Sequence, residues 1–221
     1  MAKLEFFHGV MGSGKGVFVA QMAHNTRSRG LEPITMKPGT DTKAGENIVS
    51  RVGMVVPVDI LAAQKDKERS IRETNVYSAT LAYIGQRATS SLHLIVDEVQ
   101  FFSPDQVEQL YALAHRKELP VTAFGLKADV YRNLFAGSAR LIALADRVAE
   151  LQTAVRCAGC TEKPNQNGRY INGVFDIDPS RGVVKIDGAD DDIVYDVFCN
   201  DCYDKEVVRS SQGLSVTPSG I

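Results

Sequence analysis

The sequence predicts an α/β fold, with a parallel β-sheet covered by helices on both faces and a small β subdomain after it. Three observations lead to this prediction. Short apolar segments alternate with longer amphipathic ones over the first two-thirds of the 221 residues, as in parallel strands buried on both faces. A glycine-rich loop joins the first apolar segment to the first amphipathic one. After Arg156 the chain becomes polar and carries two C-x-x-C pairs.

The elements of the sheet follow from their start and stop signals. Gly30 closes the helix that begins after the glycine-rich loop. Another helix starts at Ser103, which acts as the cap, with Pro104 at the first helical position and Gln106 completing a capping box. The expected strands are residues 4–7, 33–36, 92–96, 119–126 and 148–155, and the expected helices are residues 14–29, 77–89, 137–146 and a segment starting at 104.

The loop Gly9-x-x-x-x-Gly14-Lys15 lies between an expected strand and an expected helix, where this spacing is typical of phosphate binding. Glycines let backbone N–H groups turn toward phosphate oxygens, the helix N-terminus adds its dipole, and Lys15 can reach the β- and γ-phosphates. The alternative is a glycine-rich turn whose lysine is merely solvated. We expect the nucleotide to contact Gly9, Met11, Gly12, Ser13, Gly14, Lys15 and Gly16.

Gly16 stands where such loops place a serine or threonine whose hydroxyl binds magnesium. Magnesium retains several waters and takes oxygens from the phosphates, so the loss of one protein ligand can be tolerated. We therefore expect magnesium-ATP to bind with a weakened metal shell. A Gly16→Ser substitution is expected to strengthen that shell.

Two carboxylates follow the apolar strand of residues 92–96 directly, at the strand end where open α/β sheets bind ligands. This pattern resembles a Walker B site, in which Asp97 would hold magnesium through water and Glu98 would act as general base on a hydroxyl. The alternative is that both carboxylates are solvated acids at a strand end. The loop and these acids fit two classes, an ATPase motor that activates water and a small-molecule kinase.

The four cysteines form two pairs of equal spacing, Cys157 with Cys160 and Cys199 with Cys202. Each pair can place two thiolates on one tetrahedral ion, so the spacing predicts a structural zinc site. Four independent buried thiols would not explain the shared spacing. A redox pair is disfavoured because neither pair opens a helix after a strand in this prediction.

Composition excludes several other classes. The formal net charge is −2 and no basic stripe is visible, which argues against a nucleic-acid partner. The sequence MAKLEFFHG lacks the features of a signal peptide, and no apolar run reaches the roughly 20 residues of a membrane span. We expect a cytoplasmic protein without a membrane partner.

Nearly the whole chain resembles the zinc-containing thymidine kinase family. The resemblance is carried by LEFFHGVMGSGKG, by DEVQFF at Asp97 to Phe102, by Lys37-Pro38 with Asp41, by Ser50-Arg51-Val52-Gly53, by GLKADVYRNLFAGS and by the paired cysteines. Between the cysteine pairs, the family has a lasso loop that closes over the nucleobase and ends in a tyrosine four residues before the third cysteine. Tyr195 occupies that position.

The resemblance implies transfer of the ATP γ-phosphoryl group to the 5′-hydroxyl of thymidine or a related deoxynucleoside, with Glu98 as the base and Asp97 organising magnesium. It also suggests a homotetramer. The alternative is a nucleotide-binding protein on this fold with weak or no kinase activity and a regulatory role. The family positions that enclose the nucleoside correspond to Met11, Phe101, Leu126, Phe135 and Tyr195. Gln100 has a family counterpart without an assigned contact.

Four positions depart from the family pattern. Lys43 replaces an arginine, Val130 a phenylalanine that packs against the nucleoside, Lys127 an acidic residue, and Gly16 the hydroxyl ligand. A point charge at position 43 cannot reproduce a forked guanidinium. These departures affect the expected activity rather than the expected fold.

The chain thus divides into three expected parts. Residues 1–155 form the P-loop nucleotide-binding α/β domain, and residues 156–203 form the zinc-binding lasso subdomain with short β segments VVKI and IVYDVF. Residues 204–221 are polar with Gly, Ser and Pro, and are expected to form a mobile tail.

Overall fold

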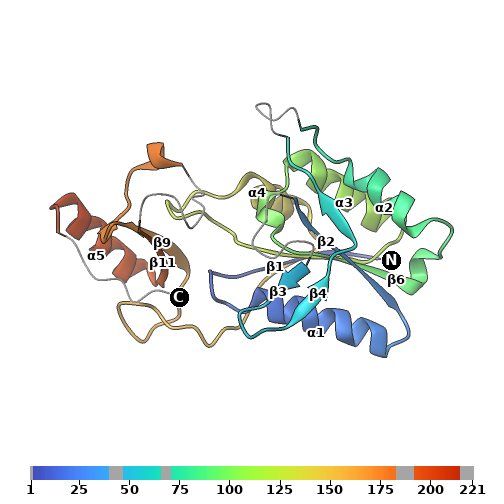
Figure 1. The fold of residues 1–221 in the computed structure, drawn as a ribbon, viewed down its shortest axis with the longest axis horizontal. Coiled ribbons are helices and arrows are strands. Elements are labelled where there is room, and N and C mark those ends of the chain that lie inside the picture. The colour runs from blue at the N-terminus through green and yellow to red at the C-terminus, as the bar shows by residue number, and fades with distance from the viewer. Residues whose placement is uncertain (1, 40–46, 66–70, 183–191, 215–221) are drawn as a thin grey trace. The chain divides into compact units, whose positions relative to one another are not determined.

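The computed structural model describes residues 2–39, 47–65, 71–182 and 192–214 of the chain. The chain forms two compact units (Figure 1). The sheet unit comprises Met1–His8, Gly14–Leu126 and Phe135–Leu151. The cysteine unit comprises Gly9–Ser13, Lys127–Leu134 and Gln152–Ile221.

The sheet unit contains a six-stranded sheet in the order β5-β2-β6-β7-β1-β8, and every pairing in it is parallel. Its strands are β1 (Leu4–His8), β2 (Glu32–Pro38), β5 (Ile60–Ala62), β6 (Leu92–Val96), β7 (Val121–Gly125) and β8 (Arg147–Glu150). The predicted α/β fold class is confirmed. Because all strands run the same way, the residues that follow β1, β6 and β7 leave the sheet at one edge.

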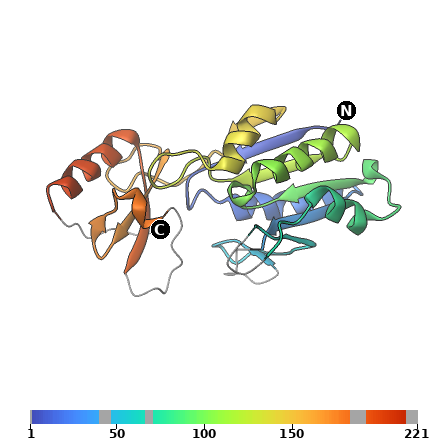
Figure 2. The ribbon, with the colours of Figure 1, turned by 90° about the horizontal axis from the view of Figure 1, so that it is seen from above.

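Helices cover both faces of this sheet (Figures 1 and 2). Leu94 of β6 packs into a core with residues of α2 (Val76–Ile84), α3 (Pro104–Arg116) and α4 (Ala136–Leu144). Its neighbour Ile95 packs on the other side with Val19 and Ala23 of α1 (Lys15–Ser28). Successive strand residues therefore face different helices, which explains why the sequence of β6 is apolar throughout.

A hairpin of β3 (Asn47–Val49) and β4 (Val55–Pro57) packs on α1. Ile48 and Val56 are buried in the same core as Val19 and Ala23 of that helix. The side-chain amine of Lys37, itself 1% exposed, donates to the carbonyl of Asn47 at 2.9 Å. Apolar packing and this hydrogen bond both fix the hairpin on the unit.

The cysteine unit contains a three-stranded antiparallel sheet, β10-β9-β11, and a C-terminal helix. Its elements are β9 (Gln166–Ile171), β10 (Val174–Phe175), β11 (Ile193–Phe198) and α5 (Asn200–Ser211). The small core joins Tyr170, Phe175, Phe198 and Tyr203 with two of the cysteines. Three one-turn 3₁₀ helices complete the described elements: η1 (Thr89–Ser91), η2 (Val99–Phe101) and η3 (Pro179–Arg181).

Several predicted elements need correction. Helix α2 ends at Ile84, not at residue 89, because Gly85 adopts a positive φ of 58°. Strand β8 ends at Glu150, not at residue 155. The polar segment at residues 166–171, for which no strand was predicted, forms the central strand β9 because β10 and β11 pair with its two edges. The predicted VVKI segment at residues 183–186 lies outside the described residues.

The expected mobile tail from residue 204 is also wrong for residues 204–211, which belong to α5. Tyr203 and Glu206 of this helix are buried, so the helix packs on its unit despite its polar sequence. The expected domain boundary differs too, since Gly9–Ser13 and Lys127–Leu134 group with the cysteine unit. The physical reason is Asn167 of β9, whose side chain accepts from the Met11 N–H and donates to the Ala128 carbonyl.

Candidate active site and metal centre

The reactive groups of the sheet unit gather where β6 and α1 meet. Lys15, the first residue of α1, is 9% exposed, and Asp97 directly follows β6 and is 6% exposed. Burial lowers the pKa of the Lys15 amine, while the carboxylates of Glu98 and then Asp97 act in the opposite direction. The structure therefore brings a buried cation together with the two carboxylates that the sequence singled out.

Glu98 is held in an unusual backbone conformation. Its φ is 49°, in the left-handed region that a side chain other than glycine rarely adopts, and its N–H donates to the Asp97 carboxylate at 2.9 Å. The side-chain amide of Gln100 donates to the Glu98 carboxylate and accepts from the Leu126 N–H at 3.0 Å. Gln100 thus orients Glu98 against the end of β7.

No contact could be assigned to Gln100 from the sequence, because its partner, the Leu126 N–H, lies at the end of β7, far away in the chain. A glycine provides the space for this contact. A Cβ at Gly125 would lie 2.6 Å from the Gln100 side-chain oxygen, so no other residue fits there without a shift. The spacing Asp97-Glu98-x-Gln100 was the available signal, but it does not show which strand the amide reaches.

Two glycines of the loop adopt backbone conformations that other residues rarely adopt. Gly12 and Gly14 adopt positive φ values of 72° and 82°, and α1 begins without a side-chain cap. The buried hydroxyl of Ser13 has no hydrogen-bond partner within the described residues. An orphaned hydroxyl and an uncapped helix start fit the oxygens of a phosphate group.

Three of the five apolar residues expected around a nucleoside lie in the sheet unit. The rings of Phe101 and Phe135 meet edge to face with centroids 5.9 Å apart. Leu126 is half-buried, and its carbonyl accepts from the Ser138 hydroxyl at 2.6 Å. Phe7 of β1 stacks on Phe124 of β7, with ring centroids 5.6 Å apart.

The other two, Met11 and Tyr195, belong to the cysteine unit. The Met11 N–H donates to the Asn167 side chain at 2.8 Å. Tyr195 lies on β11 opposite Arg169 of β9, and the two side chains form a hydrogen bond. Asn167 is a residue that sequence reasoning missed, since an asparagine in a polar stretch gives no pattern.

Arg169 is fully buried and forms the centre of a polar network in the cysteine unit. Its guanidinium pairs with Asp176, with Nε at 3.0 Å from Oδ2, and donates to the Tyr131 hydroxyl at 2.7 Å. Burial, followed by the hydrogen bond to Asp176, raises the pKa of Tyr131 to about 12. Because Tyr131 lies in the 127–134 loop, this network fixes the loop to β9 and to the same strand pair that carries Tyr195.

The residues that depart from the family pattern differ in their burial. Val130 is 4% exposed, and its carbonyl accepts from the Tyr203 hydroxyl at 2.6 Å. Lys127 is half-buried in the same loop. Lys43 lies outside the described residues.

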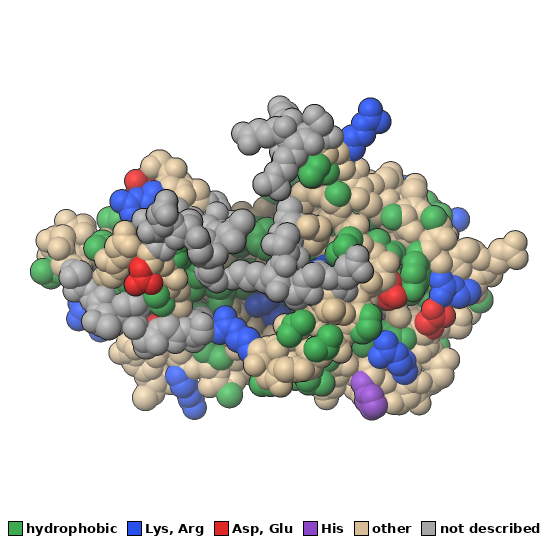
Figure 3. Space-filling view, viewed as in Figure 1, with side chains coloured by type: hydrophobic (Ala, Val, Ile, Leu, Met, Phe, Trp, Pro, Cys, Tyr) green, Lys and Arg blue, Asp and Glu red, His purple; other side chains and the backbone are tan. Residues whose placement is uncertain are grey.

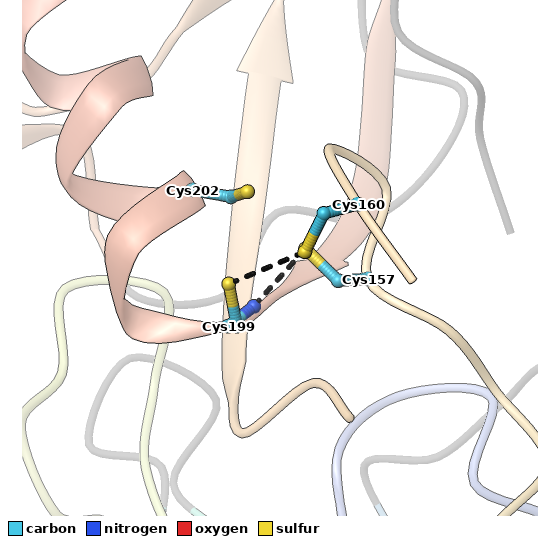
Figure 4. Close-up of side chains that lie close together, drawn as sticks. All are labelled: Cys157, Cys160, Cys199 and Cys202. Carbon is cyan, nitrogen blue, oxygen red and sulfur yellow. Dashed lines mark hydrogen bonds between the residues drawn. The ribbon is translucent and has the colours of Figure 1, made fainter. Parts of the chain in front are cut away.

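The four cysteines come together as predicted, with their sulfurs within 4.8 Å of one another (Figure 4). Cys157 and Cys160 come from one loop, and Cys199 and Cys202 from the start of α5. Because α5 directly follows β11, the expectation that neither pair opens a helix after a strand was wrong for the second pair. A tetrahedral ion with bonds of about 2.3 Å holds its sulfurs about 3.8 Å apart. The 3.6 Å between the sulfurs of Cys160 and Cys199 fits this geometry, so the cluster could hold a metal ion.

The local backbone favours a thiolate at Cys157. Burial acts to raise the pKa of the Cys157 thiol, but the N–H groups of Cys199 and Gly159, at 3.2 and 3.4 Å, outweigh it and lower the pKa. A Cβ at Gly159 would lie 2.8 Å from the Cys202 sulfur, so glycine lets the loop close on the cluster.

A parallel sheet that places a loop lysine against two carboxylates at the end of a strand defines a P-loop nucleotide-binding protein. Comparison with known proteins specifies the family. Residues 2–203 match the thymidine kinase family, and the chain belongs to it. The resemblance noted from the sequence is confirmed.

Curated relatives support this assignment over most of the chain. A protein named thymidine kinase from Streptomyces coelicolor is 33% identical over 201 residues, which are 90% of this chain and 87% of the relative. The thymidine kinase of Ruegeria pomeroyi is 37% identical over 175 residues, 77% and 83% of the two chains. None of the helices in the described ranges combines the length and the apolarity needed to cross a lipid bilayer.

Proposed function

We propose that this chain transfers the γ-phosphoryl group of magnesium-bound ATP to the 5′-hydroxyl of thymidine or a closely related deoxynucleoside. The observation that carries the proposal is the meeting of Lys15, Asp97 and Glu98 at the carboxyl edge of the sheet, in a chain of the thymidine kinase family. A regulatory nucleotide-binding protein on the same fold is the competing outcome of the experiment below.

Each residue has a distinct role in this proposal. Lys15 neutralises the β- and γ-phosphates, and the N–H groups of the loop and of the α1 N-terminus bind their oxygens. Glu98 accepts the proton of the 5′-hydroxyl as that oxygen attacks the γ-phosphorus, and Gln100 keeps the carboxylate oriented. Asp97 would hold magnesium, which would offset the negative charge of the phosphate groups.

The nucleoside carries no charge, so it must be held by ring contacts and enclosure. Met11, Phe101, Leu126, Phe135 and Tyr195 are the proposed contacts. Exclusion of water from the enclosed site directs the phosphoryl group to the sugar. Zinc at the four cysteines would fix the base of the strands that carry Tyr195, and a homotetramer remains our proposal for the assembly.

The test is ADP formation from magnesium-ATP over a panel of nucleosides. A kinase forms ADP only when an acceptor nucleoside is present, and thymidine is expected to give the highest kcat/KM. ADP formation that is independent of nucleoside, or absent with every nucleoside, would contradict the proposal and favour the regulatory alternative.

Tyr195→Ala is expected to raise the thymidine KM about ten-fold or more, because a buried aromatic contact contributes about 1.5 kcal/mol beyond its area. The ATP KM should change little, since the ring serves one substrate. Steady-state kinetics with each substrate varied in turn measures both values.

The matched control is Tyr195→Phe, which keeps the ring and removes the hydrogen bond to Arg169. The phenylalanine variant should retain the thymidine KM within about two-fold, which is below 0.5 kcal/mol. Equal changes in both KM values, or a phenylalanine variant as impaired as the alanine variant, would place Tyr195 in the structural network of Arg169 instead.

A further inference from the structure

The turn of the β3–β4 hairpin lies against Gly16, the loop position that lacks a hydroxyl. A Cβ built at Gly16 would lie 3.2 Å from the Cα of Ser50 and 3.3 Å from its Cβ. These distances are shorter than ordinary van der Waals contacts between carbon atoms. The side chain of Ser50 therefore borders the volume that a serine or threonine at position 16 would enter.

Ser50 is the inward-facing residue of this turn. It is 6% exposed, whereas Val52 two residues later is 72% exposed and Val55 is 58% exposed. Apolar side chains are visible on the surface of the sheet unit in the space-filling view (Figure 3). The turn therefore presents its apolar side chains to solvent and its hydroxyl to the interior.

The Ser50 hydroxyl is held in position by a hydrogen bond, and its oxygen can still bind one further partner. Its oxygen accepts from the Met54 N–H at 2.9 Å, and the backbone N–H of Ser50 donates to the Met54 carbonyl at 2.8 Å. A hydroxyl oxygen has two lone pairs, so one is available for another partner. Lys37 and the apolar contacts with α1 fix the hairpin behind this turn.

The residue after Ser50 carries a positive charge that acts on the lysine of the loop. The Arg51 guanidinium acts on Lys15 as a like charge and contributes to lowering the pKa of its amine. Two cations held near each other, beside Asp97 and Glu98, are the environment expected around an anionic ligand. Ser50 directly precedes Arg51 in the chain and lies against Gly16.

We propose that Ser50 supplies, from the hairpin, the magnesium-binding hydroxyl that Gly16 lacks in the phosphate loop. This inference rests on the proposed magnesium-ATP site. Magnesium prefers oxygen ligands and keeps several waters, so one hydroxyl from a neighbouring element can complete its shell. The glycine at position 16 is then required for the close approach of the turn.

The close approach of Ser50 changes the outcome expected for Gly16→Ser. The sequence alone suggests that a serine would strengthen metal binding, but the structure shows that its Cβ would crowd the backbone of Ser50. We expect the single substitution to displace the turn and to weaken the effect of magnesium on nucleotide affinity.

The test measures the affinity of a non-hydrolysable ATP analogue by calorimetry, once with saturating magnesium and once with a chelator. The ratio of the two affinities reports the metal shell and does not depend on turnover. Ser50→Ala should reduce this ratio about ten-fold, the lower end of the usual cost of perturbing a metal site. Ser50→Thr, which keeps the hydroxyl, should retain the wild-type ratio.

Gly53→Ala is the matched control for a loosened turn. Gly53 adopts a φ of 84° and donates to the Ser50 carbonyl, so alanine strains the turn and leaves the hydroxyl in place. Its ratio should equal that of the wild type. An unchanged ratio in Ser50→Ala, or an equal fall in Gly53→Ala, would overturn the role of Ser50. If magnesium does not improve binding to the wild-type chain, the proposed magnesium-ATP site itself fails.

Discussion

Glu98→Gln is expected to reduce the turnover number about 10²- to 10⁴-fold, the usual contribution of a general base, and to leave ATP affinity nearly unchanged. Glutamine has the size of glutamate and can still accept from the Gln100 amide through its carbonyl oxygen. It cannot accept the proton of the 5′-hydroxyl. Single-turnover kinetics with bound ATP measures the loss at the chemical step itself.

The control is Glu150→Gln, which removes a carboxylate at the end of β8 in the same sheet. Glu150 is not among the groups that act on Lys15, so turnover should stay at the wild-type level. Full activity in Glu98→Gln would eliminate the assignment of the base. A loss of ATP binding equal to the loss of turnover would instead mean that Glu98 supports the nucleotide site.

The sheet unit was predictable because its signals are local. β6 matches the expected residues 92–96, and α3 begins with the predicted capping box of Ser103 and Gln106. Lys15, Asp97 and Glu98 were predictable for the same reason. Each directly follows a recognisable loop or strand, and parallel strands end at a common edge.

The cysteine unit was less predictable because its contacts are distant in sequence. The residues of β9 are Gln, Asn, Gly, Arg, Tyr and Ile, which lack the alternation of a half-buried strand. Gly168 is required there because a Cβ would lie 2.6 Å from the Phe175 ring. Arg169 is buried only because Asp176 pairs with it. None of these relations is visible before the chain is folded.

The contacts of Gln100 and Asn167 show the same limit within the candidate site. Both side chains are amides that bridge backbone groups of other elements, at Leu126 for the first and at Met11 and Ala128 for the second. A sequence can place such a residue near a motif, but it does not show which backbone groups the amide will reach.

Removal of the metal from the cysteine cluster is expected to unfold the cysteine unit while the sheet unit stays folded. Structural zinc contributes about 10–16 kcal/mol of apparent binding free energy, as much as the whole stability of a typical domain. The core of the cysteine unit is small, and Cys157 and Cys202 are themselves part of it. We therefore expect pure protein to contain one zinc per chain, measured by elemental analysis.

Cys157→Ser should lose this zinc together with thymidine affinity before the sheet unit unfolds. Hydrogen exchange locates the effect, because β9, β11 and α5 should lose protection while β1, β6 and β7 keep it. Ser211→Ala is the matched control, since within the described residues this hydroxyl donates to the Val208 carbonyl of the same helix, and its loss should change neither zinc content nor protection. Zinc-free protein with full protection in β9 would refute the site. Loss of protection in β6 at the same rate as in β9 would show instead that the two units unfold together, so that the metal stabilises the whole chain rather than the strands that carry Tyr195.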